Sequence, residues 1–211
     1  MQKTVLLLGV SLLLGGSFSA QAQYRGRGGN TSLGIKAGGS LTSYVGPDSK
    51  VLGTDLFSYR FGFHVGVFAN VGLSKLFAFQ PELLYSQKGA DYATYNINGD
   101  EGERLHYIDV PLAFHVNTDG FFLEAGPQVG FLVAATYHDG SISRSLTDSF
   151  QKVDVGYLGG LGYQKKHGPG IGLRYNGAFT NAHRDYTSLG ATYERRQRNS
   201  AFQLYVTYSF N

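Results

Sequence analysis

The sequence of 211 residues has no cysteine and no tryptophan, and Met1 is its one methionine. Without cysteine a disulfide scaffold is excluded, so the stability must come from a continuous fold. The formal net charge is only +3, which is too small to indicate binding to nucleic acid. After residue 22 no segment is apolar enough for a transmembrane helix. If this chain spans a membrane, it must therefore do so as strands.

One apolar run stands near the N-terminus. Lys3 precedes Val5–Leu14, and Ala20-Gln21-Ala22 follows with the small-x-small pattern of a cleavage site. These features predict a secretory signal peptide over residues 1–22, with Gln23 as the first residue of the mature chain. The alternative is a membrane anchor, but an anchor needs about 20 apolar residues, and this run is shorter. Loss of Lys3 would lower the net charge from +3 to near +2.

Glycine and aromatic residues are abundant, with 30 glycines, 15 tyrosines and 15 phenylalanines. β-Barrels use glycine for close packing and turns, and aromatic side chains for the boundaries between lipid and water. Residues 23–30 form a lead rich in glycine and arginine, which we expect to be flexible. We expect residues 31–211 to form one outer-membrane β-barrel domain.

Eight segments alternate apolar and polar side chains with a period of two, which indicates strands. Each segment is close to the roughly 9–11 residues that a tilted transmembrane strand needs. Phe68 breaks the pattern, because it is a bulky aromatic residue on a polar face. The predicted strands cover residues 32–41, 61–71, 76–87, 105–116, 121–133, 153–163, 170–179 and 201–210.

The connections between these segments alternate between long and short. The long ones are residues 42–60, 88–104, 134–152 and 180–200, and the short ones are 72–75, 117–120 and 164–169. Short periplasmic turns and long extracellular loops are typical of outer-membrane barrels. The sequence therefore predicts an all-β fold, an eight-stranded antiparallel up-and-down transmembrane β-barrel. Both termini are expected in the periplasm.

The alternation leaves open which face points inward. A soluble barrel such as a lipocalin would line a ligand cavity with its apolar face. Here the apolar face is bulky, and eight strands leave an interior only wide enough for side chains, so we expect the apolar face in lipid. Arg or Lys on that face would cost about 2–4 kcal/mol near the midplane. The side chains predicted to point inward are Lys36, His64, Gln80, Glu82, Asp109, Glu124, Gln128, Asp154, Arg174 and Gln203.

Charges of both signs occur among these inward residues, and charges in a narrow lumen must be paired and hydrogen-bonded. We hypothesise a polar network that plugs the lumen; the alternative is a path for protons or ions. In this network Lys36 and Arg174 pair with acids among Glu82, Asp109, Glu124 and Asp154.

Three motifs that contain proline lie inside predicted strands. Because proline removes a ladder donor, Pro81, Pro111 and Pro127 predict bulges. The runs Phe79–Gly89 (FQPELLYSQKG) and Tyr107–Leu112 (YIDVPL), with Ala125-Gly126-Pro127, resemble the outer-membrane β-barrel family of Bacteroidetes.

This group, called porin family proteins, includes PorT-like proteins, and the resemblance covers nearly the whole mature chain. It implies a small outer-membrane barrel. PorT itself is tied to the system that secretes proteins across the outer membrane, but no residue here separates a PorT-like protein from its relatives. Barrels of this kind often end on an aromatic residue, whereas here Phe210 is penultimate.

No motif predicts catalysis, a cofactor or a metal site. His138 lies near Ser141 and Ser143, and His183 lies near Ser188, as in the Ser/His pair of a lipid-modifying enzyme. Such proximity is common by chance. The glycine-rich run Gly156–Gly162 (GYLGGLG) is interpreted as a strand with small inward residues, because no helix follows it to hold phosphate.

A basic cluster near the end of the chain could contact lipopolysaccharide phosphates, since arginine binds phosphate bidentately; a solvated loop is the alternative. The cluster consists of Arg184, Arg195, Arg196 and Arg198. The expected location is the outer membrane, with lipid, lipopolysaccharide and the insertion machinery as partners. The leading hypothesis is a non-enzymatic barrel with a structural or interaction role in surface loops, envelope integrity or secretion. The alternatives are a narrow channel for small solutes and, more distantly, a lipid-modifying enzyme.

Overall fold

The computed structural model describes residues 31–93, 101–139, 142–165, 167–188 and 191–210. The predicted signal peptide (residues 1–22) and the N-terminal lead (23–30) lie outside the described residues, as does Ser141. Among the described residues, no helix is long and apolar enough to cross a membrane.

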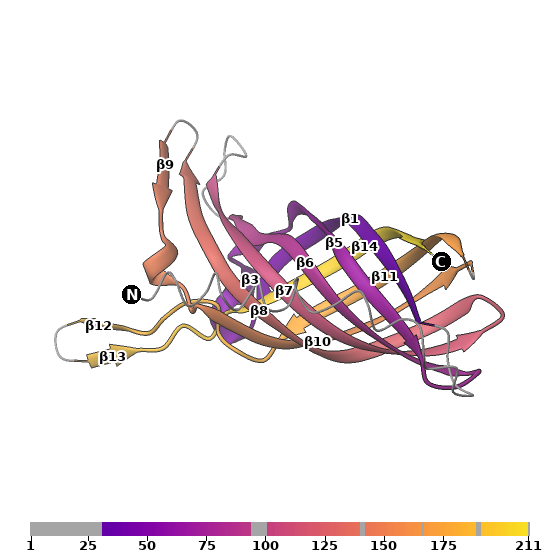
Figure 1. The fold of residues 1–211 in the computed structure, drawn as a ribbon. Helices are drawn as coiled ribbons and strands as arrows, with labels where there is room; N and C mark the ends of the chain where they lie inside the picture. The colour runs from indigo at the N-terminus through magenta and orange to yellow at the C-terminus, as the bar shows by residue number, and fades with distance from the viewer. Residues whose placement is uncertain (1–30, 94–100, 140–141, 166, 189–190, 211) are drawn as a thin grey trace, which may run out of the picture.

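Eight long strands form a closed antiparallel barrel in which each strand pairs with its neighbours along the chain (Figure 1). The pairing of β8 with β10 and of β14 with β1 completes the ring. These strands are β1 (Thr31–Val45), β5 (Arg60–Gly72), β6 (Phe77–Tyr92), β7 (Glu101–Thr118), β8 (Phe121–Asp139), β10 (Val153–Gln164), β11 (Gly168–Ala178) and β14 (Arg198–Ser209). The predicted number of strands, their order and their antiparallel arrangement are confirmed.

The two ends of the barrel differ, as the loop lengths predict. At one end β7 and β8 are joined by two residues, Asp119 and Gly120, both with positive φ. That conformation is typical of a type I′ hairpin turn, for which Asp-Gly is a favoured pair. β1 begins and β14 ends at this same end, where Gly34 pairs with Ser209.

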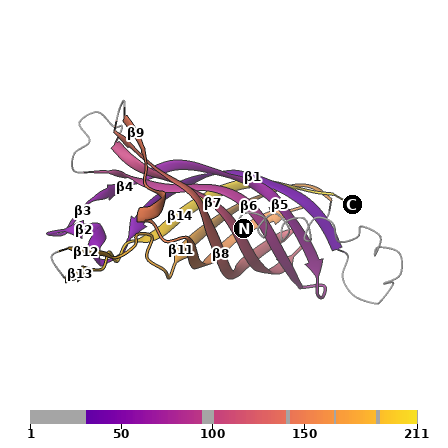
Figure 2. The ribbon, with the colours of Figure 1, turned by 60° about the vertical axis from the view of Figure 1, so that its left-hand side comes forward.

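The loops at the other end carry short elements of their own (Figure 2). β6, β7 and β8 run past their predicted ends and form, with β9, a sheet that projects from the barrel. The short elements are η2 (Pro47–Ser49), β2 (Lys50–Val51), β3 (Thr54–Asp55), β4 (Phe57–Ser58), β9 (Ile142–Ser145), η3 (Thr147–Ser149), β12 (Tyr186–Ser188) and β13 (Ala191–Tyr193).

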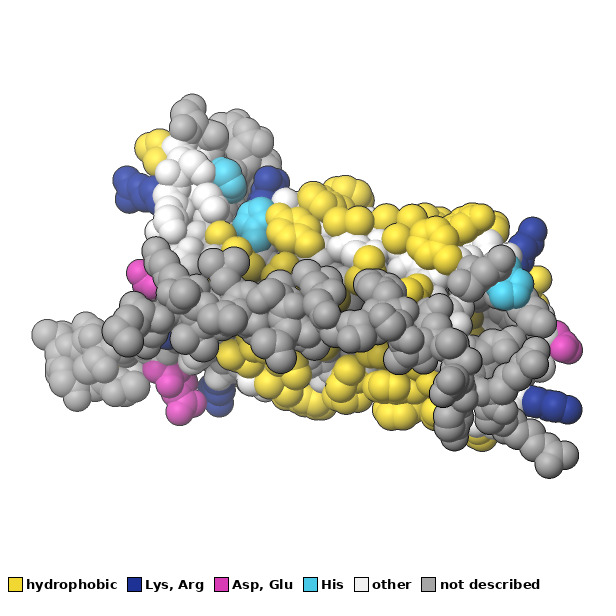
Figure 3. All heavy atoms as spheres, in the orientation of Figure 1, with side chains coloured by type: hydrophobic (Ala, Val, Ile, Leu, Met, Phe, Trp, Pro, Cys, Tyr) yellow, Lys and Arg dark blue, Asp and Glu magenta, His cyan; other side chains and the backbone are white. Residues whose placement is uncertain are grey.

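The apolar face of each strand points outward, and these faces together form an apolar belt. Figure 3 shows the apolar side chains on one side of the barrel. On β14, for example, Phe202, Leu204 and Val206 are each more than half exposed. Phe68 is the predicted exception, and its side chain is buried inside the barrel. Space for its ring comes from Gly34, where an added Cβ would lie 2.2 Å from the Phe68 ring.

The prediction of bulges at the three prolines is wrong. The register stays constant past each proline, and only isolated ladder pairs are missing. Pro81 keeps its pairing with β7, Pro111 with β8, and Pro127 with β10, and each lacks a ladder pair with the preceding strand. In an antiparallel ladder a residue directs its N–H to only one neighbour, so a missing N–H weakens one side without shifting the strand. A shift of register occurs instead between His106 and Tyr107 of β7.

Candidate functional site

The lumen is filled with polar side chains. All ten residues that the alternation directs inward are buried, each at most 7% exposed. They come from all eight barrel strands, and β10 contributes Asp154. The interior of the barrel is therefore a packed polar core.

The central cluster of the lumen is built around Arg174 of β11. Its Nε and Nη2 lie 2.8 and 2.6 Å from the two carboxylate oxygens of Glu124. Its Nη1 and Nη2 lie 2.9 and 2.8 Å from the oxygens of Glu82. Lys36 Nζ lies 3.1 Å from both oxygens of Glu82. Two cations and two carboxylates from four strands thus neutralise one another across the barrel, as charges removed from water must.

Aromatic and small residues complete this cluster. Tyr205 donates a hydrogen bond to Glu124, and Lys36 Nζ lies 3.7 Å from the centre of the Tyr205 ring. Gly160 leaves room for the carboxylate, because an added Cβ would lie 2.6 Å from Glu124 Oε1. This is the glycine-rich run of β10, which forms a strand as predicted. Within this run, Gly160 is the glycine that lies against the network.

A second cluster lies nearer the loop end and has Lys88 at its centre. Lys88 Nζ lies 3.0 Å from Asp109 and 3.4 Å from Asp154. Asn199 Nδ2 donates to Asp154 at 3.0 Å. Asp109 and Asp154 therefore pair with Lys88, and not with Lys36 or Arg174. Sequence reasoning missed Lys88 because β6 was ended at residue 87, although continued alternation from Glu82 and Ser86 directs it inward.

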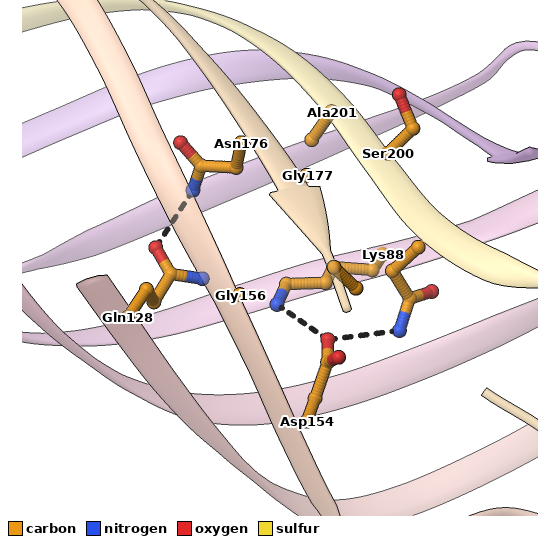
Figure 4. Close-up of a pocket in the computed structure, with 10 residues that line it drawn as sticks. Lys88, Gln128, Asp154, Gly156, Asn176, Gly177, Ser200 and Ala201 are labelled. Atoms are coloured by element: carbon orange, nitrogen blue, oxygen red, sulfur yellow. Dashed lines mark hydrogen bonds and ion pairs between the residues drawn. The ribbon is translucent and has the colours of Figure 1, made fainter. Parts of the chain in front are cut away.

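A small cavity adjoins this second cluster (Figure 4). Its volume is about 10 Å³, and Lys88, Gln128, Asp154, Asn176 and Asn199 line it. One water molecule needs about 10–15 Å³ of such space. Asn176 donates to Gln128 at 2.8 Å across the barrel. This cavity has room for about one water molecule and none for a larger solute.

The long loops close the lumen at their end of the barrel. Tyr44 and Tyr92 donate hydrogen bonds of 2.9 and 2.8 Å to the two oxygens of Glu103. His183 Nε2 lies 3.3 Å from the same carboxylate. Phe150 is 1% exposed and its ring lies 4.4 Å from that of His183. Two loops that sequence reasoning left as external segments therefore fold into the mouth of the barrel.

The geometry of a closed barrel with an apolar outer face agrees with comparison to known proteins. Residues 19–184 match the family described as "Outer membrane protein beta-barrel domain". The chain belongs to this family. No curated protein sequence matches the chain at a significant level.

Several solved structures are similar to this chain at low sequence identity. Neisserial surface protein A is 14% identical, with a TM-score of 0.48, over 87% of this chain and 99% of that one. Ail from Yersinia pestis is 14% identical, with a TM-score of 0.47, over 87% and 99%. OprG from Pseudomonas aeruginosa is 10% identical, with a TM-score of 0.46, over 87% and 98%.

The four loop arginines of this outer-membrane barrel lie against different elements. Arg184 is exposed beside η3, where its backbone N–H donates a hydrogen bond to the backbone oxygen of Ser149. Arg196 is exposed, and its backbone N–H and guanidinium bond to Asp48 at 2.8 and 3.4 Å. These bonds, the backbone one first, hold the pKa of Asp48 below its ordinary value. Arg195 is exposed, and Arg198 is half-buried opposite Val45.

The two Ser/His candidates are placed differently. Ser143 Oγ lies 3.1 Å from His138 Nδ1 on the exposed projecting sheet. A hydrolytic pair needs a third group to orient the base. In the described ranges, no carboxylate is hydrogen-bonded to His138. His183 contacts Glu103, and Ser188 ends β12. Over those same ranges, no group of three or more metal-binding side chains occurs.

Proposed function

We propose that this outer-membrane barrel is a structural or interaction protein that presents its long loops at the cell surface and conducts no solutes. The observation that carries the proposal is the pairing of Arg174 with both Glu82 and Glu124. These side chains come from β6, β8 and β11 and meet inside the barrel with 0% side-chain exposure. A path for ions would have to break bonds of 2.6–2.9 Å.

A narrow channel is the competing function. A channel for small solutes needs a continuous path of water. An eight-stranded barrel leaves an interior that is only just wide enough for its own side chains. The cavity beside Lys88 has a volume of about 10 Å³, which is room for about one water molecule. The paired charges favour a plug, because opening the lumen would leave each charge without its partner.

Single-channel recording of the purified protein in planar bilayers tests this proposal. The wild-type barrel is expected to give no steady conductance. The double variant Glu82→Ala/Arg174→Ala, checked for folding by heat-modifiable migration in SDS gels, is expected to leak small ions. Steady open-channel currents from the wild-type protein would establish the channel function instead.

The orientation in the membrane is a further part of the proposal. We propose that residues 1–22 are removed on export and that the short turns and both termini face the periplasm. The barrel would be inserted by the outer-membrane insertion machinery and would contact outer-membrane lipid and lipopolysaccharide. Kinship to the Bacteroidetes group, including a PorT-like role in secretion, remains a prediction from the sequence resemblance.

The absence of cysteine makes the orientation easy to test. A single cysteine replaces Asp148 in the loop with η3 or, as the matched control, Asp119 in the shortest turn. A maleimide that does not cross membranes should label Asp148→Cys in intact cells and label Asp119→Cys only after lysis. The opposite pattern would invert the proposed orientation. N-terminal sequencing of the mature protein should begin at Gln23.

A further inference from the structure

The outward face of the projecting sheet carries basic side chains directly beside the apolar belt. On β7, Glu103, Leu105 and Tyr107 are buried inside. Because side chains alternate along a strand, Arg104 and His106 point outward, and both are half-buried. Below them on the same face, the next outward residue is Ile108 of the apolar belt. Figure 3 shows histidine and basic side chains at this border.

His138 of β8 extends the same face. In the β7–β8 ladder His138 is opposite Gly102, and Gly102 shares the face of Arg104. The Arg60–Asp91 ion pair also covers Gly102, since an added Cβ there would lie 2.7 Å from Arg60 Nη1. Among the described residues, two arginines and two histidines therefore gather on this surface with the carboxylate of Asp91. We call Arg60, Arg104, His106 and His138 the rim cluster.

The two faces of the projecting sheet differ in charge. Glu101 and Glu103 alternate with Arg104 along β7, and Asp139, which pairs with Glu101, alternates with His138 on β8. Glu101, Glu103 and Asp139 thus share the inward side with Arg144 of β9, whereas Arg104 and His138 share the outward side with Asp91. The outward side therefore has an excess of basic side chains, which favours an anionic ligand there.

Two donors of the rim cluster are buried without a partner. Arg104 Nε and Arg60 Nε are inaccessible to solvent, and neither has a hydrogen-bond partner within the described ranges. An unsatisfied buried donor is costly, so a guanidinium that turned its Nε towards a bound group would relieve this cost. The imidazole of His106 is already fixed, because its Nδ1 lies 2.5 Å from the hydroxyl of Tyr85.

The surroundings identify the kind of anion. Tyr85 stands beside His106 and contacts Phe63, with ring centres 5.8 Å apart. Ile108 and Phe131, which pair across the β7–β8 ladder, lie immediately below, and Phe131 is 48% exposed. Tyrosine at such a boundary marks the level of lipid headgroups. A phosphate held at Arg104 would place attached acyl chains along Phe63, Ile108 and Phe131.

We propose that the rim cluster binds the phosphate of a phosphorylated glycolipid of the outer leaflet, with Arg104 and His106 as its principal donors. Arginine suits this ligand because its planar guanidinium binds phosphate bidentately. This inference rests on the proposed orientation, since it needs β9 and the loops on the outer side. It is separate from the loop arginines near residues 184–198.

Lipid retention in native mass spectrometry tests this proposal. The full mature protein is reconstituted in neutral phosphatidylcholine nanodiscs containing lipid A with its phosphates or, in a second arm, dephosphorylated lipid A. The matched control is Arg144→Gln, because Arg144 lies on the other face of the same sheet, opposite Tyr137. Arg104→Gln is expected to lower retention of phosphorylated lipid A about tenfold, whereas Arg144→Gln leaves it unchanged.

Three results would overturn the site. They are equal retention by wild type and Arg104→Gln, an equal loss with Arg144→Gln, and equal retention of the dephosphorylated lipid. Removal of the lipid by excess inorganic phosphate alone would show that the cluster binds free phosphate, and would refute the lipid assignment. A conducting wild-type barrel in the planar-bilayer experiment would refute the proposed function but leave this lipid result intact, so the two failures are distinguishable.

Discussion

Replacement of Glu82 by glutamine is the sharpest perturbation of the lumen network. Glu82 accepts hydrogen bonds from Lys36, Arg174 and Gln80, and its side chain is 0% exposed. Glu82→Gln keeps the volume and removes the charge, so Lys36 and Arg174 would share the single carboxylate of Glu124. Removing one partner of a buried ion pair costs about 3–5 kcal/mol. We expect the free energy of unfolding to fall by that amount.

Urea unfolding of the barrel in liposomes measures this loss. The matched control is Asp148→Asn, because Asp148 pairs with Lys152 at 3.5 Å and its side chain is fully exposed. It should leave the unfolding midpoint unchanged. The double variant Lys36→Met/Glu82→Gln restores equal numbers of positive and negative charges, and should recover at least half of the lost stability. A loss below about 1 kcal/mol for Glu82→Gln would refute the view that these charges depend on one another.

Three further predictions concern other parts of the barrel. Gly160→Val should destabilise it by about 1–3 kcal/mol in the same assay, since the added atoms collide with Glu124; an unchanged midpoint would contradict this. Tyr44→Phe removes a hydrogen bond to the Glu103 carboxylate and should cost about 1.5–3 kcal/mol, with faster protease cleavage of the loops; cleavage at the wild-type rate would count against the closed mouth. The pKa of Asp48 is lowered in the fold, so its loop contact persists above the ordinary value of 3.8 and is lost as the pH falls through the lowered pKa. The protection factor of the Arg196 amide, which is the intrinsic exchange rate divided by the observed rate, should therefore fall only in acid, and a loss of protection near neutral pH would contradict the assignment.

Much of the fold could be predicted because alternate residues of a barrel strand face two different environments. One set faces lipid, and the other faces the polar lumen. That alternation identified all eight strands and directed residues such as Glu82 and Arg174 inward. It failed where the outer face is no longer in lipid. Beyond Gln87 the outward residues become polar, so the extensions of β6, β7 and β8 resemble loops in the sequence.

The candidate site was harder to predict than the fold. Alternation predicts whether a side chain points inward or outward, but not its height, which is its position along the barrel axis. That position decides which charged side chains meet. Asp109 and Asp154 point inward as predicted, yet they lie at the level of Lys88 and not of Arg174. The height follows from the strand registers, which depend on contacts between distant segments. The prolines illustrate the same limit, since their effect depends on which neighbour receives each N–H.

The orientation of the apolar face is the central claim of this account, and a single tryptophan tests it most directly. The chain has none, so Leu204→Trp on the outward face of β14 and Tyr193→Trp in the loop strand β13 each give one signal. Fluorescence is measured in liposomes whose acyl chains carry bromine, which quenches only tryptophan in the hydrocarbon. We predict strong quenching at position 204 and none at 193. An unquenched tryptophan at position 204 in the folded barrel would contradict the account.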